Sequence, residues 1–268
     1  MTETTAVGIE RDGNIAIVEL QRPPHNYVDA TIMGQVADAV EELAKDNDIH
    51  AVVLASAGKS FCAGVNFTAP GEMIGSIDGT ADGAGSFAIG ARGFYDEALR
   101  VYGAPLPLIA ALQGAAIGGG AGLALACDLR VSCPEAAIST NFVKLGIHQG
   151  FGLSVTLPEL VGPSRAADML LTGRRVKGEE GLAIGLVDRC VPRDEVRASA
   201  CELAHEIAAN APLATAAVRA TLREGLVDRV RTALAHELEE QARLATTADA
   251  AEGIAAVFGK RDPNFTGR

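Results

Sequence analysis

The chain has 268 residues, of which 48% are apolar and 4% are aromatic, and its formal net charge is −11 at pH 7. This length allows one large domain, or one domain with a small appendage. The acidic balance disfavours binding to nucleic acid or to an anionic membrane, because phosphate contact needs clustered lysine and arginine.

The cysteines are scattered along the chain, and no two of them form a C-x-x-C pair. They are Cys62, Cys127, Cys133, Cys190 and Cys201. This spacing is typical of free thiols in a reducing compartment. Residues 1–5 have neither a basic region nor an apolar core, so we predict a cytoplasmic protein without a secretory signal. His205 and His236 have no partner at ligand spacing, so we predict no metal site.

The N-terminal third predicts a mixture of strands and helices. Residues 7–10 and 15–20 alternate around Asp12-Gly13, which indicates a β-hairpin. Residues 30–44 have the apolar spacing of an amphipathic helix. A short buried strand is predicted at 51–55, and the glycine-rich stretch 70–90 is predicted to be a loop.

The rest of the chain predicts repeated strand–strand–helix units and then a helical tail. Strands are predicted at 107–112, 129–133, 137–140 and 186–191, and helices at 94–101, 121–127, 150–157, 164–171 and 178–183. From Asp194 onward every segment is predicted helical, with turns near 210–212 and 225. The number of hairpins is too high for a doubly wound sheet, but the chain is still predicted to be α/β.

The triplet Gly118-Gly119-Gly120 lies at the centre of an uncharged run from Val101 to Cys127, where a predicted strand passes into a predicted helix. Glycines at this point leave backbone N–H groups uncovered, and the helix N-terminus adds partial positive charge. Such a turn can hold an anion or a developing oxyanion. The competing interpretation is close packing of a helix on a sheet.

Two other classes fit the triplet poorly. The prolines, glycines and Gln113 in the run disfavour a membrane span. The G-x-G-x-x-G spacing of dinucleotide-binding folds fails at Leu123, and no Gly-Lys-Ser/Thr follows as in a P-loop.

Four segments together resemble the crotonase (enoyl-CoA hydratase/isomerase) superfamily. They are Ser60-Phe-Cys-Ala-Gly-Val-Asn66, Gln113-Gly-Ala-Ala-Ile-Gly-Gly-Gly-Ala-Gly-Leu-Ala-Leu-Ala-Cys-Asp128, Leu145-Gly-Ile-His-Gln-Gly-Phe-Gly152 and Phe258-Gly-Lys-Arg-Asp-Pro-Asn-Phe265. The resemblance implies a spiral of ββα units in residues 1–195, which would hold the acyl-CoA site. It also implies that residues 196–268 form a helical region that builds homotrimers, often paired as hexamers.

By this resemblance, the chain processes an acyl-CoA thioester. The backbone N–H groups of Val65 and Gly119 would form an oxyanion hole for the thioester carbonyl, which stabilises an enolate. Coenzyme A would enter only as part of the substrate, with no separate cofactor.

The chain departs from the family pattern at its catalytic carboxylates. The two positions that carry glutamate in hydratases of the family are Gly122 and Phe142 here, and a third acidic position is Gly150. An isomerase, lyase or C–C hydrolase reaction is therefore open beside plain hydration. His148 is a candidate acid/base, with a capping histidine as the alternative. A non-catalytic acyl-CoA binding protein is the rival function.

The resemblance also suggests ligand contacts. The candidates are Ala63, Asn66, Gly118, Phe142 and Gln149 around the acyl thioester, and Lys260 and Phe265, with Lys59 and Arg261, for the nucleotide, the tail reaching a neighbouring subunit. Asn66 would either bind ligand or cap its turn. Glu72, Asp78 and Asp96 are weaker candidates for a replacement carboxylate. His25 and Tyr27 fit a polar turn, Cys62 fits packing, and Asp128 fits a structural hydrogen-bond acceptor.

Overall fold

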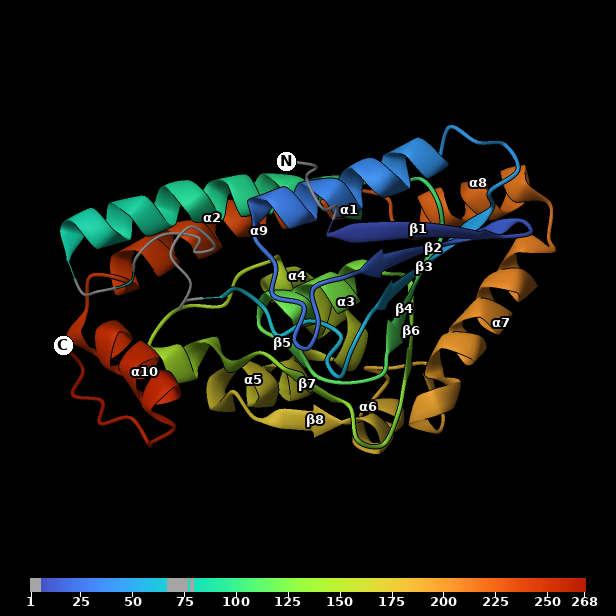
Figure 1. The fold of residues 1–268 in the computed structure, drawn as a ribbon. Coiled ribbons are helices and arrows are strands. Elements are labelled where there is room, and N and C mark those ends of the chain that lie inside the picture. Colours follow the sequence, from blue (N-terminus) through green and yellow to red (C-terminus); the bar gives the residue numbers. More distant parts are fainter. Residues whose placement is uncertain (1–5, 67–76, 78–79) are drawn as a thin grey trace, which may run out of the picture.

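The structure is a computed structural model, and it describes residues 6–66, 77 and 80–268 (Figure 1). The strands are β1 (Val7–Asp12), β2 (Ile15–Leu20), β3 (Ala51–Ser56), β4 (Leu108–Leu112), β5 (Ala116–Ile117), β6 (Leu129–Ser132), β7 (Ala137–Ser139), β8 (Arg175–Lys177) and β9 (Arg189–Cys190). The α-helices are α1 (Ala30–Leu43), α2 (Ala81–Tyr102), α3 (Gly119–Ala126), α4 (Leu153–Val161), α5 (Pro163–Thr172), α6 (Gly178–Ala183), α7 (Val196–Ala208), α8 (Pro212–Leu222), α9 (Leu226–Leu244) and α10 (Ala248–Gly259). Short 3₁₀ helices are η1 (Asn141–Leu145) and η2 (Arg193–Glu195).

The strands form two sheets. The larger sheet has the order β1-β2-β3-β4-β6-β9, in which β1 and β2 are the predicted antiparallel hairpin and the following neighbours are parallel. The smaller sheet has the order β5-β7-β8, with β5 parallel and β8 antiparallel to β7. This mixed sheet arrangement, with helices between the strands, confirms the predicted α/β class.

Both faces of the sheet are buried at β2, β3 and β4, whose side chains alternate between two cores. Val52 and Leu54 of β3 belong to one core, which α1, α2 and α3 complete. Ala51 and Val53 face the opposite core, which α7 covers with a stripe at four-residue spacing: Val196, Ala200, Ala204 and Ala208. Small residues on α7 let the helix approach the sheet closely.

The predicted loop at 70–90 is wrong in its last part. Helix α2 begins at Ala81, where the Thr80 hydroxyl accepts a hydrogen bond from the Gly83 N–H at 3.0 Å and caps the helix. Buried Phe87, Ala91 and Phe94 then recur at helical spacing. The glycines of this segment hid that periodicity. Residues 70–76 and 78–79 lie outside the described residues.

The C-terminal helices pack against the core of their own chain. Helix α9 lies against α2 and α4, and α10 lies against η1 (Figure 1). The contact between α10 and η1 is close, since a Cβ on Gly253 would lie 2.6 Å from the Leu145 carbonyl carbon. The oligomerisation role of residues 196–268 stays a prediction. Within the described residues, no helix has both the length and the apolar character needed to cross a bilayer.

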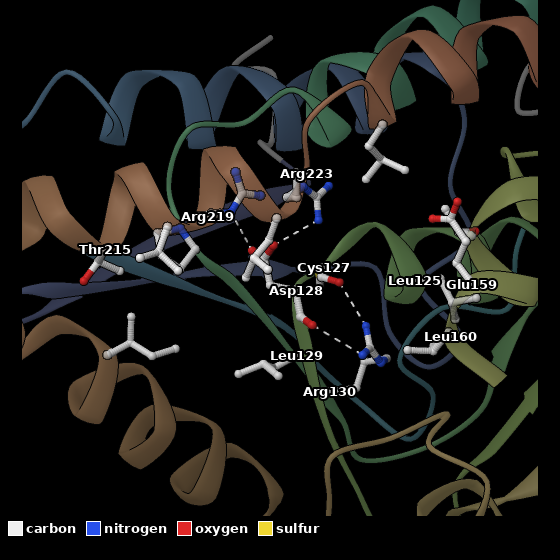
Figure 2. A pocket seen from close by; sticks show the side chains of 16 residues that line it. Leu125, Cys127, Asp128, Leu129, Arg130, Glu159, Leu160, Thr215, Arg219 and Arg223 are labelled. Carbon is white, nitrogen blue, oxygen red and sulfur yellow. Dashed lines mark hydrogen bonds and ion pairs between the residues drawn. The ribbon is translucent and has the colours of Figure 1, made fainter. Parts of the chain in front are cut away.

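Asp128 joins helix α8 to the sheet (Figure 2). Its carboxylate accepts hydrogen bonds from the Leu108 N–H at 2.8 Å, from Arg219 Nε at 2.8 Å and from Arg223 Nη1 at 2.9 Å. The two arginine side chains are only 11% and 15% exposed. Asp128 is thus the structural acceptor that its sequence position suggests.

We expect Asp128→Ala to destabilise the fold by about 3 kcal/mol, because two largely buried guanidinium groups lose their counter-charge. Urea unfolding monitored by circular dichroism measures this loss. Asp228→Ala is the matched control. It removes the exposed pair with Arg231, so it should cost less than about 1 kcal/mol. Equal losses in the two variants would contradict the role assigned to Asp128.

Candidate active site

Two segments far apart in the sequence run side by side at the site. Cys62 forms an isolated parallel bridge with Ala116. The Cys62 N–H donates to the Ala115 carbonyl at 3.1 Å, and the Ile117 N–H donates to the Cys62 carbonyl at 2.9 Å. The chain around Cys62 is therefore held alongside β5 by a single bridge.

Glycine is required where these segments touch. A Cβ on Gly120 would lie 2.1 Å from the Cys62 carbonyl oxygen. Gly64 has φ +83°, and a Cβ there would lie 2.7 Å from the Ile117 carbonyl oxygen and 3.5 Å from the Gly119 nitrogen. The first turn of α3 therefore lies directly against the turn that carries Val65.

Two backbone N–H groups are left available at this junction. Gly119 is the first residue of α3, and Gly118, with φ +55°, donates its own N–H to the Ser139 carbonyl at 2.9 Å. Neither the Val65 nor the Gly119 nitrogen donates a hydrogen bond to another residue in the described part of the chain. Val65 and Gly119 line one cavity of about 470 Å³. The helix N-terminus adds positive potential there.

Most of the predicted acyl-site residues line this cavity, and the predicted tail residues do not. Ala63, Asn66, Gly118 and Phe142 are among the lining residues, as are His25, Tyr27, Ser60, Asn141, Arg175, Ile254 and Val257. Lys260 follows Val257 at the end of α10, and Phe265 is 41% exposed beyond it. Neither of these two lines the cavity of its own chain.

The tail after α10 is held to that helix by carboxylates. Glu252 accepts from Arg261 Nη2 and from the Asn264 N–H, both at 2.7 Å. The Arg261 guanidinium is the main cause that holds the pKa of Glu252 at about 2. Arg261 is therefore paired with Glu252 of α10. Its suggested role at the nucleotide stays a prediction.

His148 and Gln149 lie beside α9 and do not line the cavity. The His148 ring packs against His236 with ring centroids 5.9 Å apart, and its Nδ1 is 2.8 Å from the Gln149 carbonyl. The Gln149 amide donates to Ser154 Oγ at 3.0 Å. The proposed acid/base role of His148 stays a prediction.

A phenylalanine ring fills the space beside Gly122. A Cβ on Gly122 would lie 2.3–2.5 Å from three atoms of Phe151, whose side chain is fully buried. Phe94 packs on that ring with centroids 5.5 Å apart, and it also lies 3.4 Å from a Cβ position on Gly119. The wall behind the two free N–H groups is therefore aromatic and contains no carboxylate among these residues.

Buried polar contacts hold Phe151 in place, although its φ of +63° is unusual for a bulky residue. The Tyr102 hydroxyl donates to the Phe151 carbonyl at 2.9 Å. The Glu237 carboxylate, fully buried on α9, accepts from the Gly152 N–H at 2.8 Å and from the Ser154 N–H at 2.9 Å. Burial raises the pKa of Glu237, and these hydrogen bonds oppose the rise. Nothing in the sequence indicated that Tyr102 and Glu237 hold the chain around Phe151 in place.

Other candidates contribute nothing to the cavity. Cys62 is buried, and burial raises the pKa of its thiol to about 12, which leaves it a packing residue. Asp96 is exposed on α2, while Glu72 and Asp78 lie outside the described residues. Within residues 6–66, 77 and 80–268, no three His, Cys, Asp or Glu side chains are grouped to hold a metal.

A second cavity, of about 520 Å³, lies between α3, α4, α7 and α8 (Figure 2). Its walls are largely apolar, and Arg219 and Arg223 are paired with Asp128. It contains none of the residues of the glycine triplet. The cavity at Val65 and Gly119 is therefore the better candidate for chemistry.

Comparisons with known proteins agree with this fold. A model of the enoyl-CoA hydratase/isomerase family matches residues 10–268. The short-chain-enoyl-CoA hydratase of Clostridium acetobutylicum is 33% identical over 261 residues, which cover 97% of each chain. A putative enoyl-CoA hydratase of Thermus thermophilus is 38% identical over 94% of this chain and 98% of that one. The carnitinyl-CoA dehydratase of Salmonella enteritidis is 32% identical over 97% of this chain and 98% of that one.

The solved structures give the same result. A crystal structure of an enoyl-CoA hydratase from Mycobacterium avium subsp. paratuberculosis aligns with a TM-score of 0.81 and 26% identity, covering 97% of this chain and 98% of that one. The fold and the site thus define a crotonase-like α/β protein. The chain belongs to the enoyl-CoA hydratase/isomerase family.

We expect Gly120→Ala to destabilise the fold by about 3 kcal/mol and to weaken acyl-CoA binding, because its Cβ would push the Cys62 carbonyl away. Gly85→Ala in α2 is the control, since nothing lies within 4 Å of its Cβ position. That change should be neutral or slightly stabilising. Urea unfolding and calorimetric titration measure both effects. Unchanged stability and affinity in Gly120→Ala would contradict the close contact between Gly120 and the Cys62 carbonyl.

A double-mutant cycle tests the contact between Phe151 and Gly122. Gly122→Ala should cost about 2 kcal/mol in the wild-type background and close to nothing in a Phe151→Ala background, where the ring is gone. Chemical denaturation of the four proteins measures the coupling. Additive losses would show that the ring does not fill this space.

Proposed function

We propose that this protein binds the coenzyme A thioester of a carboxylic acid and stabilises the thioester enolate through the N–H groups of Val65 and Gly119. The observation that supports this most is the pair of unengaged N–H groups, which come from two turns and line one cavity at a helix N-terminus. The relatives named as enoyl-CoA hydratases and carnitinyl-CoA dehydratase support an acyl-CoA substrate.

The chemistry follows from where charge develops. When an α-proton or a carbon substituent leaves the α-carbon, its electron pair delocalises onto the thioester oxygen. Two preorganised N–H donors in a dry site stabilise that oxygen, and each is worth about 3–4 kcal/mol in comparable sites. The buried Phe94 and Phe151 behind Gly119 keep water from competing for the same donors.

We further propose that the reaction is an isomerisation, a lyase reaction or a C–C hydrolysis. Plain two-carboxylate hydration has less support, because the described residues that line the cavity include no aspartate or glutamate. Gly122 and Phe142 occupy the two positions where the family pattern has glutamate. His148 is the proposed acid/base, and it would reach the ligand only by moving from His236 toward the cavity.

The second candidate function is a non-catalytic acyl-CoA binding protein. The same lack of a carboxylate among the described lining residues favours it. Both candidates share the bound thioester, so they differ only in whether the enolate forms.

We also propose a homotrimer or hexamer located in the cytoplasm. The exposed leucines and valine of α8 support an assembly: Leu213 is 86% exposed, Val218 60% and Leu222 81%. Val218 and Leu222 lie one helical turn apart, and neighbouring exposed apolar side chains of this kind are typical of surfaces that another subunit covers.

The decisive test removes one N–H donor and leaves the rest of the site. Proline is tolerated at the first position of a helix, so Gly119→Pro deletes the donor with little damage to α3. Gly119→Ala is the matched control, because it keeps the N–H and its Cβ lies 3.4 Å from the Phe94 ring. Unfolding curves check that both variants fold.

The measured reaction is exchange of the α-protons of butyryl-CoA in D₂O, followed by mass spectrometry, with butyryl-CoA binding measured by calorimetry. We expect exchange in the wild type and in Gly119→Ala, and a loss of about 100-fold or more in Gly119→Pro. Binding without exchange would favour the non-catalytic protein. If butyryl-CoA does not bind the wild type, the proposed function is wrong. His148→Ala in the same assay tests the acid/base role.

A further inference from the structure

The side chain of Asn141 lies against the turn that carries Gly119. Asn141 lines the candidate cavity, and its Oδ1 atom is 3.7 Å from the position of a Cβ on Gly118. Three covalent bonds, which span at most about 4 Å, separate that Cβ position from the Gly119 nitrogen. The Oδ1 atom is therefore within about 8 Å of this nitrogen. At that distance the carboxamide can contact the acyl group of a thioester whose carbonyl oxygen is held by the Gly119 N–H.

Hydrogen bonds from buried side chains hold the backbone that leads into Asn141. Asn141 is the first residue of η1, directly after Ser139 and Thr140. Ser139 Oγ donates to the Gly173 carbonyl at 3.2 Å, and Thr140 Oγ1 donates to the Met169 carbonyl at 3.1 Å. Gly173 also packs closely, since a Cβ there would lie 3.2 Å from the Asn141 Cα. The carboxamide is thus presented to the cavity from a supported backbone, as a specific ligand contact requires.

The carboxamide of Asn141 has no hydrogen-bond partner among the residues that the structure describes. By contrast, the Asn26 amide donates to the carbonyls of Ala57 and Ser60 and serves the fold. The polar atoms of Asn141 are also accessible, because Arg219 Nη2 is the one fully buried side-chain nitrogen or oxygen without a partner in the described part of the chain. Asn141 therefore offers the cavity both a donor and an acceptor.

The neighbours of this carboxamide are apolar. Phe142 and Leu145, from the same 3₁₀ helix, are buried and line the cavity, and the Phe142 ring is 3.8 Å from the Cβ position on Gly118. A saturated acyl chain that covers Asn141 removes water from the carboxamide and leaves it unpaired, which weakens binding. A hydroxyl group both donates and accepts, so it can pair with either end of the carboxamide. The site therefore favours a hydroxylated acyl chain.

We propose that Asn141 is a specificity-determining residue, which hydrogen-bonds a hydroxyl group on the acyl chain of the bound thioester. This inference rests on the proposed function. The thioester oxygen would lie about 3 Å from the Gly119 nitrogen, and the hydroxyl oxygen about 3 Å from the Asn141 amide. A hydroxyl group on C3 or C4 of the acyl chain spans the gap that remains between these two contacts. Asn141 is neutral, so it selects the acyl group and transfers no proton.

Three thioesters that differ by one hydroxyl group test this role. They are butyryl-CoA, 3-hydroxybutyryl-CoA and 4-hydroxybutyryl-CoA, and calorimetric titration gives the dissociation constant of each. The measured quantity is the preference, defined as the dissociation constant of butyryl-CoA divided by that of a hydroxybutyryl-CoA. Because both ligands bind the same protein, effects on folding or on the coenzyme A moiety cancel in this ratio. The ligand that shows the preference identifies the carbon that carries the hydroxyl group.

We expect the wild type to prefer one of the hydroxybutyryl-CoA ligands about 10-fold, as for a polar group left unpaired when its partner is missing. Asn141→Leu keeps the size of the side chain and removes both polar atoms. It should lower the preference below 2-fold, and it should bind butyryl-CoA at least as tightly as the wild type does. Asn47→Leu is the matched control, because Asn47 is exposed and does not line the cavity. It should keep the full preference.

Two results would overturn the role of Asn141. One is equal affinity of the wild type for all three thioesters, which would leave the proposed function intact. The other is a preference that Asn141→Leu retains in full. If the wild type binds none of the three thioesters, the proposed function is wrong, and the role of Asn141 is wrong with it.

Discussion

The close contact between the Cys62 carbonyl and the backbone at Gly120 is the constraint on which the site depends. The contact leaves no room for a Cβ at residue 120, and it brings the segment 60–66 alongside β5. Val65 and Gly119, on either side of this contact, line one cavity. The surrounding fold holds this contact between Cys62 and Gly120 in place. The hydrogen bonds from Val28 N–H to Gly64 and from Ala63 N–H to His25 tie the other side of the same segment to the turn before α1.

Aromatic side chains, more than charged ones, surround the backbone of Gly118 and Gly119. Phe151 takes the space beside Gly122, and Phe94 and Phe142 lie close to Gly119 and Gly118. The ionisable groups nearby serve structure: Glu237 caps α4 and fixes the chain next to Phe151, and Asp128 ties α8 to the sheet. The polar side chains that line the cavity include His25, Asn141 and Arg175.

The sequence predicted the parts of this arrangement that local pattern controls. Alternating apolar residues predicted β1 and β2, short apolar runs predicted β3 and β4, and the glycine triplet predicted the turn into α3. It did not predict the part of α2 before residue 94, because Gly83, Gly85 and Gly90 mask its apolar spacing. The three-residue strand β8 is too short to leave a pattern, so Arg175 was missed.

Long-range packing explains the remaining differences. No local pattern shows that Phe151, with a positive φ, fills the space of a residue 29 positions earlier in the chain. Likewise, no local pattern shows that Ile254 and Val257 of α10 line the cavity. The predicted reach of the C-terminal tail to a neighbouring subunit stays a prediction. The sequence shows glycine at position 122, but it does not show that Phe151 packs beside it.

The carbonyl stretch of a bound thioester tests the central claim most directly. Butyryl-CoA labelled with ¹³C at the thioester carbonyl can be followed by isotope-difference infrared spectroscopy when it is bound to the wild type. Two N–H donors on one oxygen polarise the carbonyl, so the band should move to lower frequency on binding. A bound thioester whose carbonyl band stays at its position in water would contradict the account.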